Sequence, residues 1–164
     1  MARNIRKIRV EGNIAFVQLT RGMEAVIDAE DIDIVNIRNW RIENFNNMYA
    51  VAKIDKKRVY MHRLILSAMS GFVVDHIDGD TLNNRRSNLR IASTTENARN
   101  CKVQRNNTSG VKGVCWNKAR GAWAARIKVS GKNIHLGYFS DLNDAAASYA
   151  KGSAMYHGEF GRVK

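Results

Sequence analysis

Apolar and polar residues alternate along much of the first 60 residues, which is the period of a half-buried β-strand. Strands are expected at 4–10, 13–20, 48–55 and 57–61. The run DAEDIDIVNI, residues 28–37, predicts one short helix with Asp28 as its N-cap. Trp40 and Tyr49 are expected to be core aromatics rather than ligand contacts. The pattern therefore predicts a small β-rich region over 1–60.

The pattern changes over 61–104, where strands and helices alternate. The run MHRLILSAM, residues 61–69, predicts a helix with Leu64, Ile65 and Met69 facing inward. Strands are expected at 72–77 and 88–93, and the turn formers DGDTLNN lie between them. The stretch 94–104 lacks Gly and Pro and predicts a second helix. The order is strand, loop, strand, helix.

A polar stretch at 105–110 is expected to be a linker to a separate region over 111–164. Three strands are expected there, at 112–117, 122–130 and 132–140, with turns that contain Gly. A helix is expected over 141–158, with Asp141 as its N-cap and Gly158 at its end. The predicted class is α+β, with this last region a three-stranded antiparallel sheet packed on one helix.

Charge narrows the range of partners. The 27 Lys and Arg residues outnumber the 15 Asp and Glu residues, which gives a net charge of +12 and a pI near 10.1. The excess is concentrated in the second half of the chain. Such a surplus favours a polyanion through counterion release from phosphates. The alternative is a soluble protein that is basic for no functional reason.

Other classes of protein and site are disfavoured. No apolar run approaches the length of a transmembrane helix, and the N-terminus lacks the apolar middle of a secretory signal. We therefore expect an intracellular, soluble protein that does not bind membranes. The two cysteines, Cys101 and Cys115, do not form a CxxC pair, so we expect neither a structural zinc nor a disulfide.

The stretch VVDHIDGDTLNNRRSNLRIAS places Asp75 directly before His76. A carboxylate binds hard cations such as Mg²⁺, and a neutral imidazole can take a proton from water near pH 7. Asn97, on the helix that follows, could supply a second oxygen ligand. The alternative is a structural Asp75–His76 salt bridge, with the asparagines only forming turns.

Residues 45–104 resemble the HNH endonucleases, in the homing-endonuclease-like branch common in phages, through HRLI, DHIDGD, NNRRSNLR and a later Asn. The resemblance implies a ββα-metal nuclease with one Mg²⁺ or Mn²⁺ per active site. It implies that His76 is the general base, that Asp75 and Asn97 are metal ligands, and that Asn88 holds the loop and orients the base. Phosphate contacts are expected from Arg85, Arg86 and Arg90. His62 is assigned to packing or to a phosphate contact.

Residues 109–161 resemble the AP2 domains through KGV, W, ARI, HLGYF and SYA, and this implies a sheet that contacts duplex DNA. The residues expected on the exposed face are Lys112, Trp116, Arg120, Trp123, Arg126, Lys128 and His135. Core packing is the alternative for the two tryptophans, and Tyr138 or Phe139 is expected in the core. Arg126 stands where the family usually has an acid and His135 where it has Trp, so no base preference transfers.

Together these features predict a metal-dependent HNH DNA endonuclease that acts as a monomer, nicks duplex DNA and is targeted by the AP2-type region. The alternative is a sequence-specific DNA-binding regulator in which the nuclease unit is inactive. An RNA-binding protein is disfavoured, since neither RNP-type nor KH-type signals are present.

Overall fold

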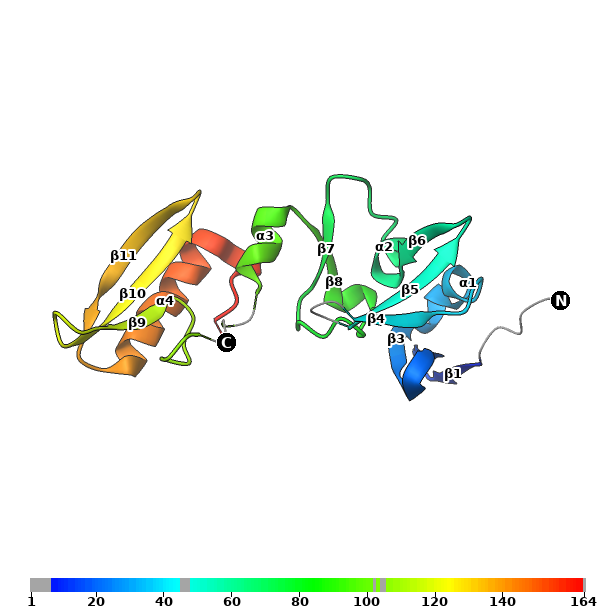
Figure 1. The fold of residues 1–164 in the computed structure, drawn as a ribbon, viewed down its shortest axis with the longest axis horizontal. Coiled ribbons are helices and arrows are strands. Elements are labelled where there is room, and N and C mark those ends of the chain that lie inside the picture. Colours follow the sequence, from blue (N-terminus) through cyan, green and yellow to red (C-terminus); the bar gives the residue numbers. More distant parts are fainter. Residues whose placement is uncertain (1–6, 45–47, 102, 104–105, 164) are drawn as a thin grey trace. The chain divides into compact units, whose positions relative to one another are not determined.

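The computed structural model describes residues 7–44, 48–101, 103 and 106–163, and it forms two compact units divided at Thr94 and Thr95 (Figure 1). Small antiparallel sheets and short helices make up both units, so the predicted α+β class is confirmed. The regions expected at 1–60, 61–104, 105–110 and 111–164 therefore fall within two compact units. None of the helices in the described ranges is both long and apolar enough to cross a membrane.

The first unit opens with a three-stranded meander of β1 (Ile8–Glu11), β2 (Ile14–Gln18) and β3 (Glu24–Asp28). β3 was not expected from the sequence. The helix expected over 28–37 is instead a 3₁₀ turn, Ala29–Asp31, followed by α1 (Ile32–Val35). Asp28 occupies the N-cap position of this turn, as expected, but its side chain makes no capping hydrogen bond, and its Oδ2 instead accepts one from the backbone nitrogen of Arg86, at 2.7 Å.

A second meander joins β4 (Arg41–Asn44), β5 (Met48–Ile54) and β6 (Lys57–Tyr60), and α2 (Met61–Ile65) follows it directly. The helix expected over 61–69 stops at Ile65. The Arg63 guanidinium donates hydrogen bonds to the backbone carbonyls of Ala68, Met69 and Phe72, at 3.1, 2.9 and 2.7 Å. These carbonyls therefore accept bonds from a side chain, and the segment after Ile65 is not helical. Met69, expected to face inward, is 73% exposed.

A hairpin of β7 (Val73–His76) and β8 (Leu89–Ala92) completes the first unit, with a 3₁₀ turn, Arg86–Asn88, before β8. Its loop is attached to β3. The amide of Val26 donates to Leu82 O at 2.9 Å, and the amide of Asn84 donates to Val26 O at 2.7 Å. The N-terminal strands therefore fix the loop that follows Asp75 and His76.

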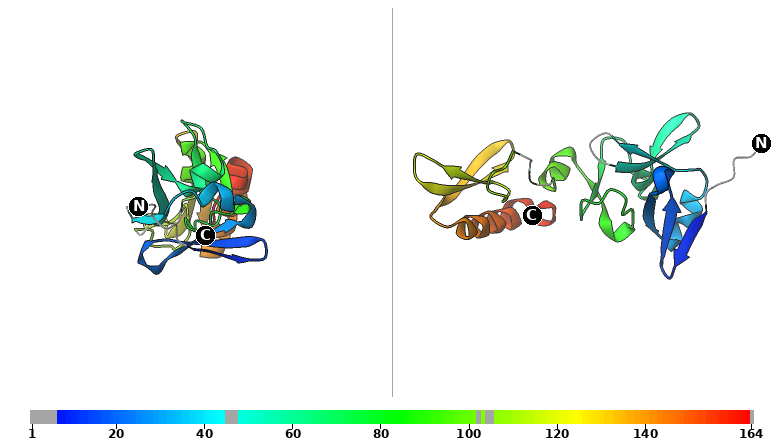
Figure 2. Two further views of the ribbon diagram at one scale, coloured as in Figure 1. Left: turned by 90° about the vertical axis from the view of Figure 1, so that its right-hand side faces the viewer. Right: turned by 60° about the horizontal axis from the view of Figure 1, so that its bottom comes forward.

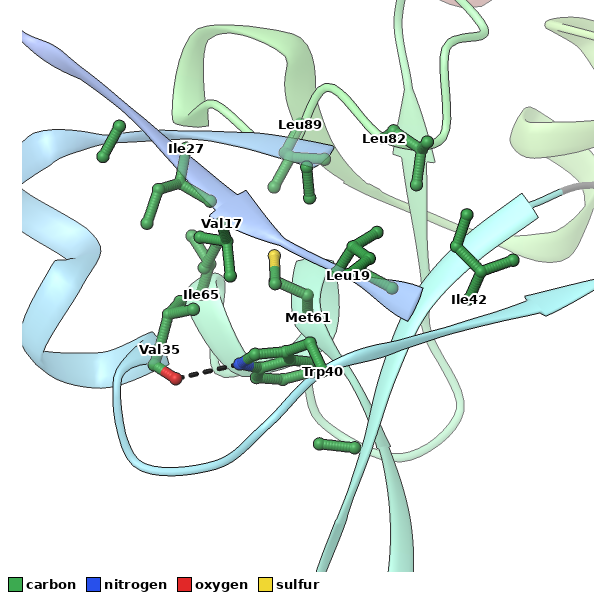
Figure 3. Packing of buried hydrophobic residues seen from close by; sticks show 14 of the residues in the cluster. Val17, Leu19, Ile27, Val35, Trp40, Ile42, Met61, Ile65, Leu82 and Leu89 are labelled. Atoms are coloured by element: carbon green, nitrogen blue, oxygen red, sulfur yellow. Dashed lines mark hydrogen bonds between the residues drawn. The ribbon is translucent and has the colours of Figure 1, made fainter. Parts of the chain in front are cut away.

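One hydrophobic core joins these pieces (Figure 3). Residues from β2, β3, α1, α2 and the hairpin all contribute to it. Trp40 is 1% exposed, as expected for a core aromatic, and its Nε1 donates to Val35 O at 2.9 Å. Because this core includes Val74 and Leu89, the strands that carry the candidate site are anchored in it.

The second unit begins with α3 (Thr94–Arg99), which overlaps the division at its first residue. The helix expected over 94–104 therefore ends earlier, and positions 102, 104 and 105 lie outside the described residues. Next come β9 (Val114–Asn117), β10 (Ala122–Val129) and β11 (Lys132–Phe139), in the order β11-β10-β9.

The helix α4 (Leu142–His157) covers one face of this sheet (Figure 2). Asp141 caps it as predicted, since Oδ1 accepts hydrogen bonds from the amides of Asn143 and Asp144. Gly113 has φ +70°, and a Cβ there would lie 2.1 Å from the ring of Tyr149. Only glycine allows β9 to approach α4 this closely.

Candidate active site

Asp75 and Arg90 face each other across the β7–β8 hairpin. The Asp75 Oδ2 atom accepts hydrogen bonds from Arg90 Nε, at 2.9 Å, and from Arg90 Nη2, at 2.7 Å. The carboxylate side chain is 5% exposed and the guanidinium side chain 12%. A buried ion pair of this geometry fixes the direction of the carboxylate. Arg90, expected to bind phosphate, is therefore directed at Asp75.

His76 lies beside a second histidine. The ring centroids of His62, on α2, and His76 are 5.0 Å apart, with the planes at 82°. Tyr49 of β5 lies 5.4 Å from His62 and 6.2 Å from His76, and Tyr60 lies 5.5 Å from His62. We call these four residues the aromatic cluster. No periodicity in the sequence predicts this cluster, and Tyr49 was expected to be a core aromatic.

Both histidines favour the neutral form. Burial, aided by the nearby His76 and Arg63, lowers the pKa of His62 from 6.5 to about 3. Burial also lowers the pKa of His76, although the side chain of Asn84 and three nearby aspartates oppose the shift. A neutral imidazole has one nitrogen that can accept a hydrogen bond or a proton. The cluster thus holds two such rings beside the buried carboxylate of Asp75.

Asn88 spans the loop that follows His76. Its Nδ2 donates to Asp78 Oδ1 at 2.9 Å and to Asn83 O at 2.8 Å, and its Oδ1 accepts from the amide of Asp78 at 3.0 Å. Burial acts to raise the pKa of Asp78, but hydrogen bonds from the Asp80 amide, Asn83 and Asn88 outweigh it and lower that pKa. These bonds tie the start of the loop to its end.

The other two arginines of the motif differ from each other. The Arg86 guanidinium contacts the buried carboxylate of Asp31, at 2.7 Å, and the carbonyl of Ile65, at 3.2 Å. Among the described residues, the group of His, Cys, Asp or Glu side chains close enough to share a cation is Asp28, Glu30 and Asp31, which surrounds this guanidinium. Arg85 Nε donates to a neutral amide oxygen in this loop, Asn83 Oδ1, at 3.1 Å.

Asn97 lies on α3, in the second unit. Its backbone carbonyl accepts a weak hydrogen bond from Cys101 Sγ, at 3.7 Å. The metal site that Asn97 and Asp75 were expected to share stays a prediction.

Basic side chains lie on one face of the β4–β6 sheet and form a strip that was not predicted from the sequence. In the strand register Lys53 pairs with Arg58, and Val51 with both Tyr60 and Arg41, so these side chains share one face. The Arg58 guanidinium lies 5.4 Å from the ring of Tyr60, a member of the aromatic cluster. Two cations directly opposite each other destabilise a sheet. The strip is defined here as Arg41, Lys53 and Arg58, and Glu43 on the same face partly neutralises it, with Oε1 3.6 Å from Arg41 Nη2 and 3.4 Å from Arg58 Nη1.

The sheet of the second unit has one covered and one open face. Arg126, Lys128 and His135 are exposed on the open face, as expected. Arg120 lies over the ring of Tyr138, 4.5 Å from its centroid, and the Tyr138 ring is 4.4 Å from that of His135. Tyr138 is 38% exposed. This face therefore carries a continuous group of basic and aromatic side chains.

The expected placement of Trp123 on the exposed face is wrong. Trp123 packs with Ala125 and Ile127 against the core beneath α4, because alternate residues of one strand share a face. Trp116 pairs directly with Trp123, at 5.1 Å between rings, and is 44% exposed on that same side. Phe139 joins the core, as was expected of it or of Tyr138.

Lys112 also differs from the expectation of an exposed contact. Its Nζ donates to the carbonyls of Arg99, at 2.5 Å, and Cys101, at 2.8 Å. Burial lowers the pKa of this amine. Lys112 therefore binds the carbonyls that follow α3. Cys101 and Cys115 are both exposed free thiols.

Comparison with known proteins identifies the region that contains Asp75 and His76. Residues 59–99 match the HNH endonuclease family. The chain is 38% identical over 94 residues to Protein 3.8 of Escherichia phage T7, an alignment that covers 57% of this chain and 77% of the phage protein. No solved structure matches the chain. The chain belongs to the family of phage Protein 3.8 and carries an HNH endonuclease domain at residues 59–99.

Proposed function

We propose that the protein is a DNA endonuclease that hydrolyses phosphodiester bonds in duplex DNA. The observation that carries the proposal is a buried His76, with a lowered pKa, directly after a buried Asp75 inside the HNH domain. A neutral imidazole at neutral pH can act as a general base. The surplus of positive charge suits a phosphate polymer as substrate.

In this proposal His76 takes a proton from the water that attacks phosphorus. Asn88 keeps the loop after His76 in place, and Arg90 keeps the Asp75 carboxylate aimed in one direction. Arg85 is proposed to contact a phosphate beside the scissile bond. We do not assign phosphate contacts to Arg86 and Arg90, because both guanidinium groups bind carboxylates of the protein.

One divalent cation is proposed to complete the site. The carboxylate oxygen of Asp75 and the side-chain carbonyl of Asn97 are hard donors, so they fit Mg²⁺ or Mn²⁺ better than a soft metal. When bound, such an ion would stabilise the negative charge that develops on the phosphate and on the leaving oxygen. Asp75 is held ready for this task by its pairing with Arg90.

The second unit is proposed to bind the DNA that the nuclease cuts, as an AP2-type sheet would. Arg126, Lys128 and His135 on the open face would contact the duplex. Linking two binding modules raises the effective concentration of the nuclease at that DNA. A monomer with a single nuclease site would cut one strand, so we propose nicking.

A regulator whose nuclease site is inactive is the second candidate. Because the open face of the β9–β11 sheet would serve either function, binding assays cannot separate them. Supercoiled plasmid incubated with the protein and Mg²⁺ should convert to nicked circles, and EDTA should prevent this. Binding without any cut strand in Mg²⁺ or Mn²⁺, on several DNA substrates, would favour the regulator.

A further inference from the structure

His62 has no role in the chemistry proposed so far, yet it is a buried polar side chain of the first unit. It is 7% exposed and lies on α2, two residues after Tyr60, the last residue of β6. Its Nδ1 is buried and has no hydrogen-bond partner among the described residues. Leaving a buried polar atom unpaired costs about 1–3 kcal/mol. A phenylalanine would avoid that cost, so packing alone does not explain a histidine here.

The surroundings of His62 hold the ring in one place. Tyr49 and Tyr60 both pack against it, at 5.4 and 5.5 Å between ring centroids, and also against each other, at 5.8 Å. The plane of the ring is nearly perpendicular to that of His76, at 82°. The two rings are in edge-to-face contact at 5.0 Å, so one nitrogen of each can lie within hydrogen-bond distance, about 2.8 Å, of a single water placed beside the pair.

We propose that His62 is a second catalytic residue, whose Nδ1 accepts a hydrogen bond from the attacking water while His76 removes the other proton of that water. The proposal rests on the proposed nuclease function. Water has two O–H bonds, and fixing both of them directs a lone pair of the oxygen at phosphorus. As the new O–P bond forms, one proton passes to His76 and the other stays on the hydroxyl held by His62. The bond to the 3′ oxygen breaks, and that oxygen takes a proton from solvent.

The two histidines then have different tasks. With a pKa of about 3, His62 remains neutral throughout and is too weak a base to remove the proton itself. His62 orients the attacking water, and this task requires only a hydrogen-bond acceptor at the position of its Nδ1. An amide oxygen can also accept a hydrogen bond, whereas a phenyl ring cannot.

The test compares His62→Phe, which keeps the ring but loses the acceptor, with His62→Gln, which keeps an acceptor. Single-turnover nicking of plasmid DNA in Mg²⁺ is measured with the full chain, together with affinity for DNA in EDTA. We expect His62→Phe to lower the rate on the order of 10–100-fold, with His62→Gln within about tenfold of the wild type. DNA affinity should be unchanged in both variants.

Val35→Ala is the matched control, because it truncates a fully buried core residue outside the aromatic cluster. It should lower the thermal midpoint without lowering the nicking rate at a temperature where the variant is folded. If His62→Phe cuts as fast as the wild type, or His62→Gln is as slow as His62→Phe when both are folded, the inference is wrong. A wild-type protein that never cuts DNA overturns the proposed function, and this inference with it.

Discussion

Arg90 donates two hydrogen bonds to a single oxygen of Asp75, and neither side chain is more than 12% exposed. The two residues lie directly opposite each other in the β7–β8 register. An arginine within the HNH motif thereby holds the carboxylate that precedes the proposed base. This pairing links the stability of the hairpin to the geometry of the site.

Replacing Arg90 should therefore be costly. Arg90→Ala leaves a buried carboxylate without its cation, and breaking such pairs costs about 3–5 kcal/mol. Urea denaturation measures the loss in free energy of unfolding. Arg9→Ala, which breaks half-exposed pairs with Glu11 and Glu24, is the control and should cost less than about 1 kcal/mol. If Arg90→Ala and Arg9→Ala lower the free energy of unfolding by similar amounts, the buried Asp75–Arg90 pair stabilises the protein no more than an exposed pair does.

Burial of His62 predicts a pH dependence of stability. Its pKa is 6.5 in the unfolded chain and about 3 in the folded one, so between these values the unfolded chain binds the extra proton. Stability therefore falls as the pH drops below 6.5, by about 2 kcal/mol at pH 5. His76, whose pKa is also lowered, acts in the same direction.

Urea denaturation of the wild type and of His62→Gln at pH 7.5 and pH 5 checks this. The variant should lose about 2 kcal/mol less than the wild type between the two pH values, because glutamine does not titrate. Equal losses in both proteins would mean that His62 keeps an ordinary pKa when folded.

The basic strip on the β4–β6 sheet should contact the phosphates that flank the cut. Lys53→Ala with Arg58→Ala should weaken DNA binding and reduce the slope of log affinity against log salt by about 2. Lys57→Ala, which removes one charge where the double variant removes two, is the control, since Lys57 pairs with Ile54 and faces the other side of the hairpin. If the slope of log affinity against log salt is unchanged in the double variant, the strip does not contact DNA.

The open face of the second unit should also bind DNA. Arg126→Ala with Lys128→Ala is expected to weaken binding to uncut duplex by more than about tenfold at low salt, through lost phosphate and base contacts. Lys151→Ala, on the exposed side of α4, is the control and removes one positive charge where the open-face pair removes two. If Lys151→Ala weakens binding as strongly as the open-face pair, charge alone explains the effect.

Much of the fold could be predicted because its signals are local. The strands of the hairpin and of the second sheet are short apolar-rich runs bounded by turn residues, and Asp141 and Gly158 mark the ends of α4. β3 and β4 were missed because no sequence signal marks them, and each becomes a strand by pairing, β3 with β2 and β4 with β5. Tertiary pairing decides such segments.

The contacts within the site were harder to foresee. The register that places Arg90 against Asp75 depends on a long loop, which leaves strand pairing open in the sequence. The contact of His62 with His76 arises from packing of α2, which no periodicity reports. Trp123 and Arg126 were both expected on the exposed face, but residues three apart on a strand point to opposite faces. The burial of Trp123 could therefore be predicted from the sequence.

Single-turnover nicking of supercoiled plasmid by His76→Ala, beside the wild type, tests the central claim most directly. In Mg²⁺ the wild type should produce nicked circles, whereas His76→Ala should bind the plasmid equally well and cut at least about 100-fold more slowly, as expected for loss of a general base. If His76→Ala nicks the plasmid as fast as the wild type, His76 is not the base and the account is wrong.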